Sequence, residues 1–160
     1  MIAALAYPTW DQVDQGCSRI VTELFQRFTQ DKAPTVIVGL ARGGLVPAVR
    51  ISHLYHDTPI LTINYSAKNG RGDTKHDGND LTPGDALKPN QAPAGTHVLI
   101  VDDLVDSGHT MKDVADMFVS RGCVVTTAVL HAKEGSVIMP DIVWQHVPHD
   151  GPWIHYPWDL

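Results

Sequence analysis

Three carboxylates within five residues are the side chains of this sequence best suited to chemistry. Asp102 and Asp103 directly follow the aliphatic run 98–101. Asp106 then opens the short turn 106–110, after which apolar residues return at helical spacing. An aliphatic run bounded by turn residues is typical of a buried strand. We therefore expect these carboxylates just beyond the carboxyl end of a strand, where open α/β sheets bind their ligands.

The residues of this stretch suit different parts of one ligand. Ser107, Gly108 and Thr110 are small, so that backbone N–H groups and hydroxyls can converge on a phosphate monoester at the start of the following helix. Asp102 and Asp103 would repel a phosphate, but they suit the vicinal hydroxyls of a sugar or a cation that bridges phosphates. A sugar phosphate with Mg²⁺ meets all these demands; the alternative is an acidic loop without a ligand.

A second anion-binding loop is expected after the predicted buried strand 35–40. The tetrapeptide Ala41-Arg42-Gly43-Gly44 stands there, before a predicted helix 45–55. Glycines let the backbone approach a ligand closely, and the arginine adds positive charge. The plainer alternative is a glycine turn with a surface arginine.

The remaining pattern predicts a doubly wound, mainly parallel α/β sheet flanked by helices. A capping box from Thr9 to Gln12 begins an amphipathic helix over 10–29. Further strands are expected at 59–65, 124–130 and 142–145. The connection 66–96 has no periodicity, and we interpret it as a flexible hood that closes over the site; a disordered surface insertion is the alternative.

The bulk properties exclude several classes of protein. The length of 160 residues predicts a single domain over 1–160. A formal net charge of −6 argues against a nucleic-acid partner. No apolar run approaches the ~18 residues of a membrane span, and the start 1–8 lacks the basic leader of a signal peptide. Cys17 and Cys123 lack a CxxC spacing and are expected to be buried thiols of a cytoplasmic protein.

Together these motifs resemble the type I phosphoribosyltransferases, which use 5-phosphoribosyl-1-pyrophosphate (PRPP). The stretch 98–110 has the form of their PRPP signature, an aliphatic strand, two acidic and two apolar residues, then Asp-Thr/Ser-Gly-x-Thr. The loop 41–44 is similar to their pyrophosphate loop, which implies a cis peptide between Ala41 and Arg42. The PRPP-binding residues that the resemblance implies are Ala41, Arg42, Gly43, Asp102, Asp103, Asp106, Ser107, Gly108, His109 and Thr110.

The carboxyl-terminal part of the chain is similar to the purine-binding part of the bacterial xanthine-guanine type. Lys133 follows a predicted strand, and the tail 147–160 is rich in aromatic residues that could stack on a flat base. The resemblance implies that Lys133 donates to the 6-oxo group, that Trp153 covers the purine and that the backbone at Ile154 helps to read it. A solvated lysine and an aromatic plug or dimer contact are the alternatives.

The resemblance implies a reaction as well as a site. The 5-phosphoribosyl group of PRPP would pass to guanine, xanthine or hypoxanthine, giving a nucleoside 5′-monophosphate and pyrophosphate. Asp106 would be the general base, with Asp102 and Asp103 also catalytic, and Mg²⁺ would bind near Asp102, Asp103 and Asp159. The family implies a homodimer or homotetramer. Two alternatives remain at this point: a PRPP-binding regulator on the same fold, and a phosphoribosyltransferase for another nucleobase.

Overall fold

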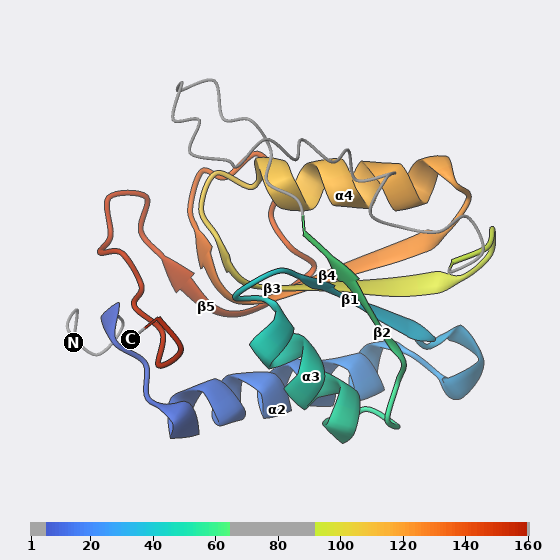
Figure 1. Cartoon of the computed structure of the whole chain (residues 1–160), viewed down its shortest axis with the longest axis horizontal. Helices are drawn as coiled ribbons and strands as arrows, with labels where there is room; N and C mark the ends of the chain where they lie inside the picture. The colour runs from blue at the N-terminus through green and yellow to red at the C-terminus, as the bar shows by residue number, and fades with distance from the viewer. Residues whose placement is uncertain (1–5, 65–91, 160) are drawn as a thin grey trace.

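Five parallel strands form one sheet within residues 6–64 and 92–159, which are the residues that the computed structural model describes (Figure 1). The order across the sheet is β2-β1-β3-β4-β5, and every neighbouring pair is parallel. The strands are β1 (Val36–Leu40), β2 (Ile60–Ile63), β3 (His97–Val105), β4 (Val124–Lys133) and β5 (Ile142–Val147). The helices are α2 (Trp10–Arg27), the short 3₁₀ helix η1 (Gln30–Lys32), α3 (Leu45–Leu54) and α4 (His109–Ser120).

Helices cover both faces of this sheet, which confirms the predicted doubly wound α/β class. Helices α2 and α3 lie on one face and α4 lies on the other (Figure 1). Along β3, Leu99 and Val101 belong to the core under α2 and α3, whereas Val98 and Ile100 belong to the core under α4. Because successive strand residues face opposite sides, a strand buried on both faces must be apolar throughout. This explains the unbroken aliphatic run that the sequence shows before the carboxylates.

Helix α2 begins where the sequence predicts. The Thr9 hydroxyl accepts from the Gln12 N–H at 3.3 Å, and the Gln12 side chain accepts from the Thr9 N–H at 2.8 Å. The helix ends at Arg27, two residues before the predicted boundary, because Phe28 has extended backbone angles. Phe25 belongs to the predicted apolar stripe but is half exposed, and it packs beside Tyr55 instead of entering the core.

Strands β3 and β4 are longer than predicted, which corrects the expected position of the acidic residues. Asp102 and Asp103 lie inside β3, not beyond its end. The ladder with β4 continues past them, pairing Asp102 with Val129 and Leu104 with His131. In the local sequence, two carboxylates indicate that a strand has ended. The strand continues because it pairs with β4, whose residues lie about 27 positions further along the chain. For the same reason β4 includes Lys133.

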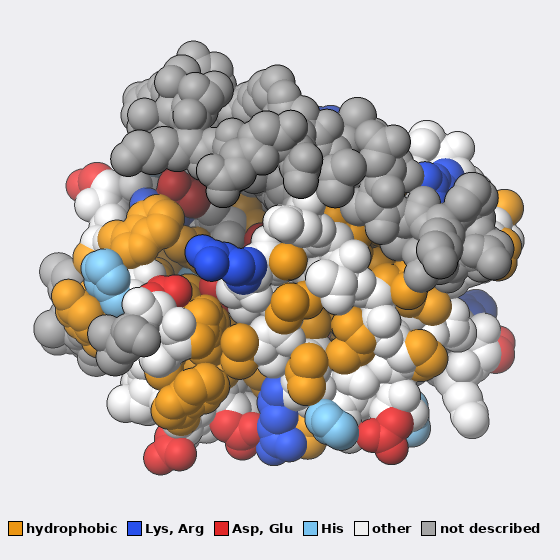
Figure 2. All heavy atoms as spheres, in the orientation of Figure 1, with side chains coloured by type: hydrophobic (Ala, Val, Ile, Leu, Met, Phe, Trp, Pro, Cys, Tyr) orange, Lys and Arg blue, Asp and Glu red, His pale blue; other side chains and the backbone are white. Residues whose placement is uncertain are grey.

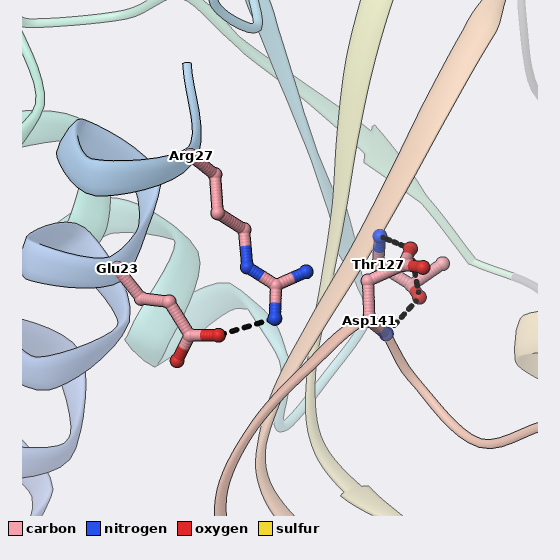
Figure 3. Close-up of polar contacts among 4 residues, drawn as sticks. All are labelled: Glu23, Arg27, Thr127 and Asp141. Atoms are coloured by element: carbon pink, nitrogen blue, oxygen red, sulfur yellow. Dashed lines mark hydrogen bonds and ion pairs between the residues drawn. The ribbon is translucent and has the colours of Figure 1, made fainter.

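The edge strand β5 is held to β4 by a pair of polar residues. The carboxylate of Asp141 accepts from the backbone N–H and the hydroxyl of Thr127 at 2.8 and 2.9 Å, and the Asp141 N–H donates to the same hydroxyl at 2.9 Å (Figure 3). The crossover 134–141 contains no helix, so these bonds help to set the register of the strand that follows it. The ion pair between Arg27 and Glu23, in the same figure, lies within α2.

Only the end of the predicted hood, residues 92–96, belongs to the described part of the chain. Ala92 is buried, and the Gly95 N–H donates to the Gly122 carbonyl at 2.9 Å. These residues therefore lie at the amino ends of β3 and β4, opposite the edge that carries the acidic residues. A hood over the site remains a prediction for residues 66–91, which lie outside the described residues. Among the helices that the structure describes, none has the length and apolar character that crossing a membrane requires.

Candidate active site

The strand order brings the two predicted anion-binding loops to one place. From β1 the chain moves to β2 on one side, whereas β3 lies on the other side and is followed by β4 and β5. In open α/β sheets, ligands bind at the carboxyl ends of the strands where the order changes direction in this way. That position is between β1 and β3. The loop with Arg42 follows β1, and the turn with Asp106 follows β3.

The glycine loop lies directly against the acidic pair. A Cβ atom built on Gly43 would be 1.9 Å from the Oδ2 atom of Asp103, and one built on Gly44 would be 2.8 Å from the Oδ1 atom of Asp102. Only glycine allows this loop to approach the acidic pair of β3 this closely. The peptide between Ala41 and Arg42 is cis, as the family resemblance implies, and the arginine is exposed.

The acidic pair is held in an environment that disfavours its charge. Asp102 accepts from the Asp103 N–H at 2.9 Å, and Asp103 accepts from the Leu104 N–H at 2.8 Å. Burial raises the pKa of Asp102 well above its usual value, and the neighbouring charge of Asp103 raises it further. Burial also raises the pKa of Asp103, to which the charge of Asp159 adds. Hydroxyl donors or a cation would favour the ionised forms, so the pair suits a sugar diol or Mg²⁺.

The turn after β3 leads into helix α4 through a glycine in the left-handed region. Gly108 has a φ of 84°, and a Cβ built on it would be 3.0 Å from the side chain of Ile138. The Val137 N–H donates to the Ser107 carbonyl at 2.9 Å, which anchors the turn to the β4–β5 crossover. Among the described residues no side chain caps the start of α4 at His109. Its first N–H groups therefore point to the turn, an arrangement that suits a phosphate.

Lys133 connects the acidic turn to the carboxyl-terminal tail. Its Nζ atom lies 3.0 Å from the Oδ1 atom of Asp106 and 5.4 Å from the centre of the Trp153 ring. The lysine side chain is only 12% exposed, whereas Trp153 is 55% exposed. The solvated lysine that was the alternative is therefore not what the structure shows. More than half of the tryptophan is therefore exposed beside the charged pair.

A cavity of about 300 Å³ lies between β3 and the tail. This volume is within the range of small-molecule sites. Acidic, basic and hydrophobic side chains adjoin one another near the carboxyl-terminal tail in the space-filling view (Figure 2). The residues that line the cavity are Asp103, Leu104, Asp106, Trp153, Ile154, His155, Tyr156 and Asp159.

Two residues of this region are absent from the sequence-based prediction. Tyr156 is buried and its hydroxyl donates to the backbone carbonyl of Asp103 at 2.8 Å. His131 is fully buried in β4, and its Nδ1 atom lies 2.8 Å from the same hydroxyl. The one signal in the sequence was a histidine directly after the aliphatic end of the predicted strand 124–130. The tyrosine had none, because its role depends on how the tail folds back.

The residues predicted to hold a metal carry carboxylate oxygens, which are donors that Mg²⁺ prefers. Among residues 6–64 and 92–159, no three histidine, cysteine or acidic side chains converge as a metal-binding group. Asp159 accepts from the Tyr156 N–H at 2.8 Å. Mg²⁺ commonly binds one or two carboxylates and takes its other ligands from substrate phosphates and water. The half-buried pair Asp102 and Asp103 fits that kind of site.

The fold and the site together define a class: doubly wound α/β proteins with a ligand-sized cavity beside the acidic end of a parallel sheet. Comparison with known proteins identifies the family. The model of the phosphoribosyl transferase domain matches residues 9–160. The chain belongs to this family and is a phosphoribosyltransferase.

Several proteins similar to this chain are named as phosphoribosyltransferases of purines. It is 30% identical over 155 residues to a xanthine-guanine phosphoribosyltransferase of Cereibacter sphaeroides, covering 95% of this chain and 85% of the relative. It is also 30% identical over 151 residues to the enzyme of the same name from Gluconobacter oxydans, covering 94% and 82%. A crystal structure of a purine phosphoribosyltransferase from Pyrococcus horikoshii has a TM-score of 0.74 and 28% identity, covering 96% of this chain and 93% of that one.

Proposed function

We propose that this enzyme transfers the 5-phosphoribosyl group of PRPP to a 6-oxopurine, with guanine, xanthine and hypoxanthine as candidate substrates. One observation carries the proposal. The ion pair of Asp106 and Lys133 lies beside the exposed ring of Trp153, at the mouth of a cavity that Asp103 also lines. A base stacked on that ring would meet one hydrogen-bond acceptor and one donor of opposite charge next to a site for the sugar. The names of the sequence relatives support the same substrate class.

At the end of the site that would bind the sugar, the role of each residue follows from its charge. Asp102 and Asp103 would bind the ribose hydroxyls, and their negative charge would stabilise an oxocarbenium-like transition state at C1. The 5′-phosphate would bind the turn 107–110 at the start of α4, a position favoured by the helix dipole. Ala41, Arg42 and Gly43 would hold the pyrophosphate as it leaves. The close contact of this loop with the acidic pair supports that arrangement.

At the base end, the proton has to leave the purine as N9 attacks C1. Asp106 would accept it as the general base, because its carboxylate is half exposed and lines the cavity. Lys133 would donate to the 6-oxo group, which no 6-aminopurine offers. Trp153 would cover the ring, and the backbone at Ile154 would read its edge.

Magnesium fits the oxygen donors of this site. Asp102 and Asp103 would hold the ion together with groups of PRPP. Asp159 would add negative charge near the ion, since its charge also raises the pKa of Asp103, without completing a three-residue metal group with the pair. When bound, Mg²⁺ would neutralise part of the charge on the departing pyrophosphate. Its presence would also return the acidic pair to the ionised state that burial disfavours.

The test is turnover with separate bases. The protein is incubated with PRPP, Mg²⁺ and one of guanine, xanthine, hypoxanthine, adenine or uracil, and both pyrophosphate and the nucleotide product are measured. We expect turnover with at least one 6-oxopurine and none with adenine or uracil. Turnover with adenine or uracil alone would overturn the substrate class. Tight PRPP binding without turnover of any base would favour a PRPP-binding regulator instead.

A further inference from the structure

The hydroxyl of Tyr156 lies where the tail meets the acidic strand. The side chain is 2% exposed, and the residue lines the cavity. Its Oη atom donates to the carbonyl oxygen of Asp103 at 2.8 Å and lies 2.8 Å from the Nδ1 atom of His131. A single buried hydroxyl therefore joins the tail that carries Trp153 to the backbone of β3 and to β4.

The hydrogen bonds around this hydroxyl can run in only one direction. Since Tyr156 donates its one proton to Asp103, it must accept from His131, whose Nδ1 atom then carries the hydrogen. Burial lowers the pKa of His131 to about 4, so the ring is neutral near pH 7 and Nε2 is an acceptor. The side-chain amide of Gln145 lies beside Nε2, with its Oε1 atom 3.2 Å away. Turning this amide by 180° places its nitrogen there as the donor that a neutral Nε2 needs. The chain of donors runs from Gln145 through His131 and Tyr156 to Asp103.

Packing leaves this tyrosine little freedom to move. Its ring stacks on Trp158 with centres 4.6 Å apart and planes 5° from parallel. Its backbone N–H donates to Asp159 at 2.8 Å, and His131 packs edge-on against Trp144. The phenol can change position only if the tail changes position with it. The distance between the tail and β3 is therefore set at this residue.

We propose that Tyr156 is a positioning residue, which holds the backbone of Asp103 at the correct distance from the tail that binds the base. The inference rests on the proposed function, because the sugar would lie on Asp103 and the base on Trp153. The attacking nitrogen and C1 react only within a narrow range of distances, and a shift of about 1 Å can lower the rate by about 100-fold. Tyr156 spans the two halves of the site, from the tail to the backbone carbonyl of Asp103.

The variant Tyr156→Phe tests this role. Phenylalanine keeps the stack on Trp158 and the cavity wall, but it removes the bond to Asp103. We expect kcat to fall by about 10-fold to 100-fold while KM for the purine changes by less than about threefold, because the wall that binds the base is retained. A residue that only stabilised the fold would lower the melting temperature and leave kcat unchanged when it is measured far below that temperature.

The matched control is Tyr55→Phe. Tyr55 is also a buried tyrosine, 1% exposed, but it packs beside Phe25 under α2 and α3 and does not line the cavity. We expect this variant to keep the kcat of the unmodified enzyme. A Tyr156→Phe enzyme with kcat within about twofold of the control would overturn the inference.

Two further outcomes are distinguishable. If the unmodified enzyme turns over a 6-oxopurine and the variant does so equally well, the inference fails and the proposed function stands. If the unmodified enzyme turns over no base, both fail. If Tyr156→Phe does not fold, Gln145→Met replaces it, since that change removes the amide that contacts His131 outside the cavity lining. We then expect kcat to fall at least about threefold, and an unchanged kcat would overturn the inference.

Discussion

Replacing Asp106 with asparagine separates catalysis from stability at one residue. Its carboxylate is 53% exposed and pairs with Lys133 at 3.0 Å. Exposed ion pairs contribute ~0–1 kcal/mol to the free energy of unfolding. Lys133 itself is only 12% exposed, but asparagine keeps a side-chain oxygen that can accept its hydrogen bond, so the loss stays near about 1 kcal/mol. A lost general base lowers kcat by ~10²–10⁴-fold, equivalent to roughly 3–5 kcal/mol of activation free energy. We therefore expect a fall of at least about 100-fold in kcat with almost no change in melting temperature.

The assay compares three quantities for Asp106→Asn: kcat with a 6-oxopurine, the Kd for PRPP by calorimetry, and the melting temperature. Asparagine keeps the shape of the side chain, so PRPP binding should be largely intact. The matched control is Asp116→Asn, which loses an ion pair with Lys112 on the exposed side of α4, outside the cavity lining. This control should retain full kcat.

Two results would refute the reasoning. A kcat for Asp106→Asn within about threefold of the control would remove the residue from the role of general base. If Asp106→Asn lost as much affinity for PRPP as it lost in kcat, the main contribution of Asp106 would be to binding the sugar phosphate and not to proton transfer.

Three further predictions follow from the same structure. Lys133→Met should lower kcat/KM for the purine by about 10-fold to 100-fold, because a charged hydrogen bond of ~1.5–3 kcal/mol is lost; an unchanged value in initial-rate assays would exclude contact with the base. Gly43→Ala should weaken PRPP binding at least about tenfold by calorimetry, since the new Cβ would lie 1.9 Å from an oxygen of Asp103; unchanged binding would show that the loop can move without loss. His131 has a pKa lowered by burial to about 4, against 6.5 for an ordinary histidine, so its neutral form adds stability that is complete above about pH 6.5 and is lost as the pH falls toward 4. The free energy of unfolding is measured with urea at pH 7.5 and at about pH 5. Between these two pH values it should fall by roughly 2 kcal/mol more in the unmodified protein than in His131→Gln. Equal falls in the two proteins would contradict the assigned protonation state.

The strand boundaries show where local sequence stops being informative. The aliphatic run 98–101 marks β3 clearly, because a strand buried on both faces needs apolar side chains at every position. The same pattern predicts that the strand ends before Asp102, which is too early. The ladder to β4 continues to Val105, and hydrogen bonds to a distant strand leave no trace in local composition.

The class of fold, the acidic stretch 98–110 and the glycine loop 41–44 can be predicted from the sequence alone, because each depends on residues that are neighbours in the chain. Only the tertiary structure decided that Gly43 lies against Asp103 and that the hydroxyl of Tyr156 bonds to Asp103, 53 residues away. It also decided that Lys133 pairs with Asp106 beside an exposed tryptophan. The physical reason is that these contacts depend on strand order and on the return of the tail, which arise from packing of the whole core.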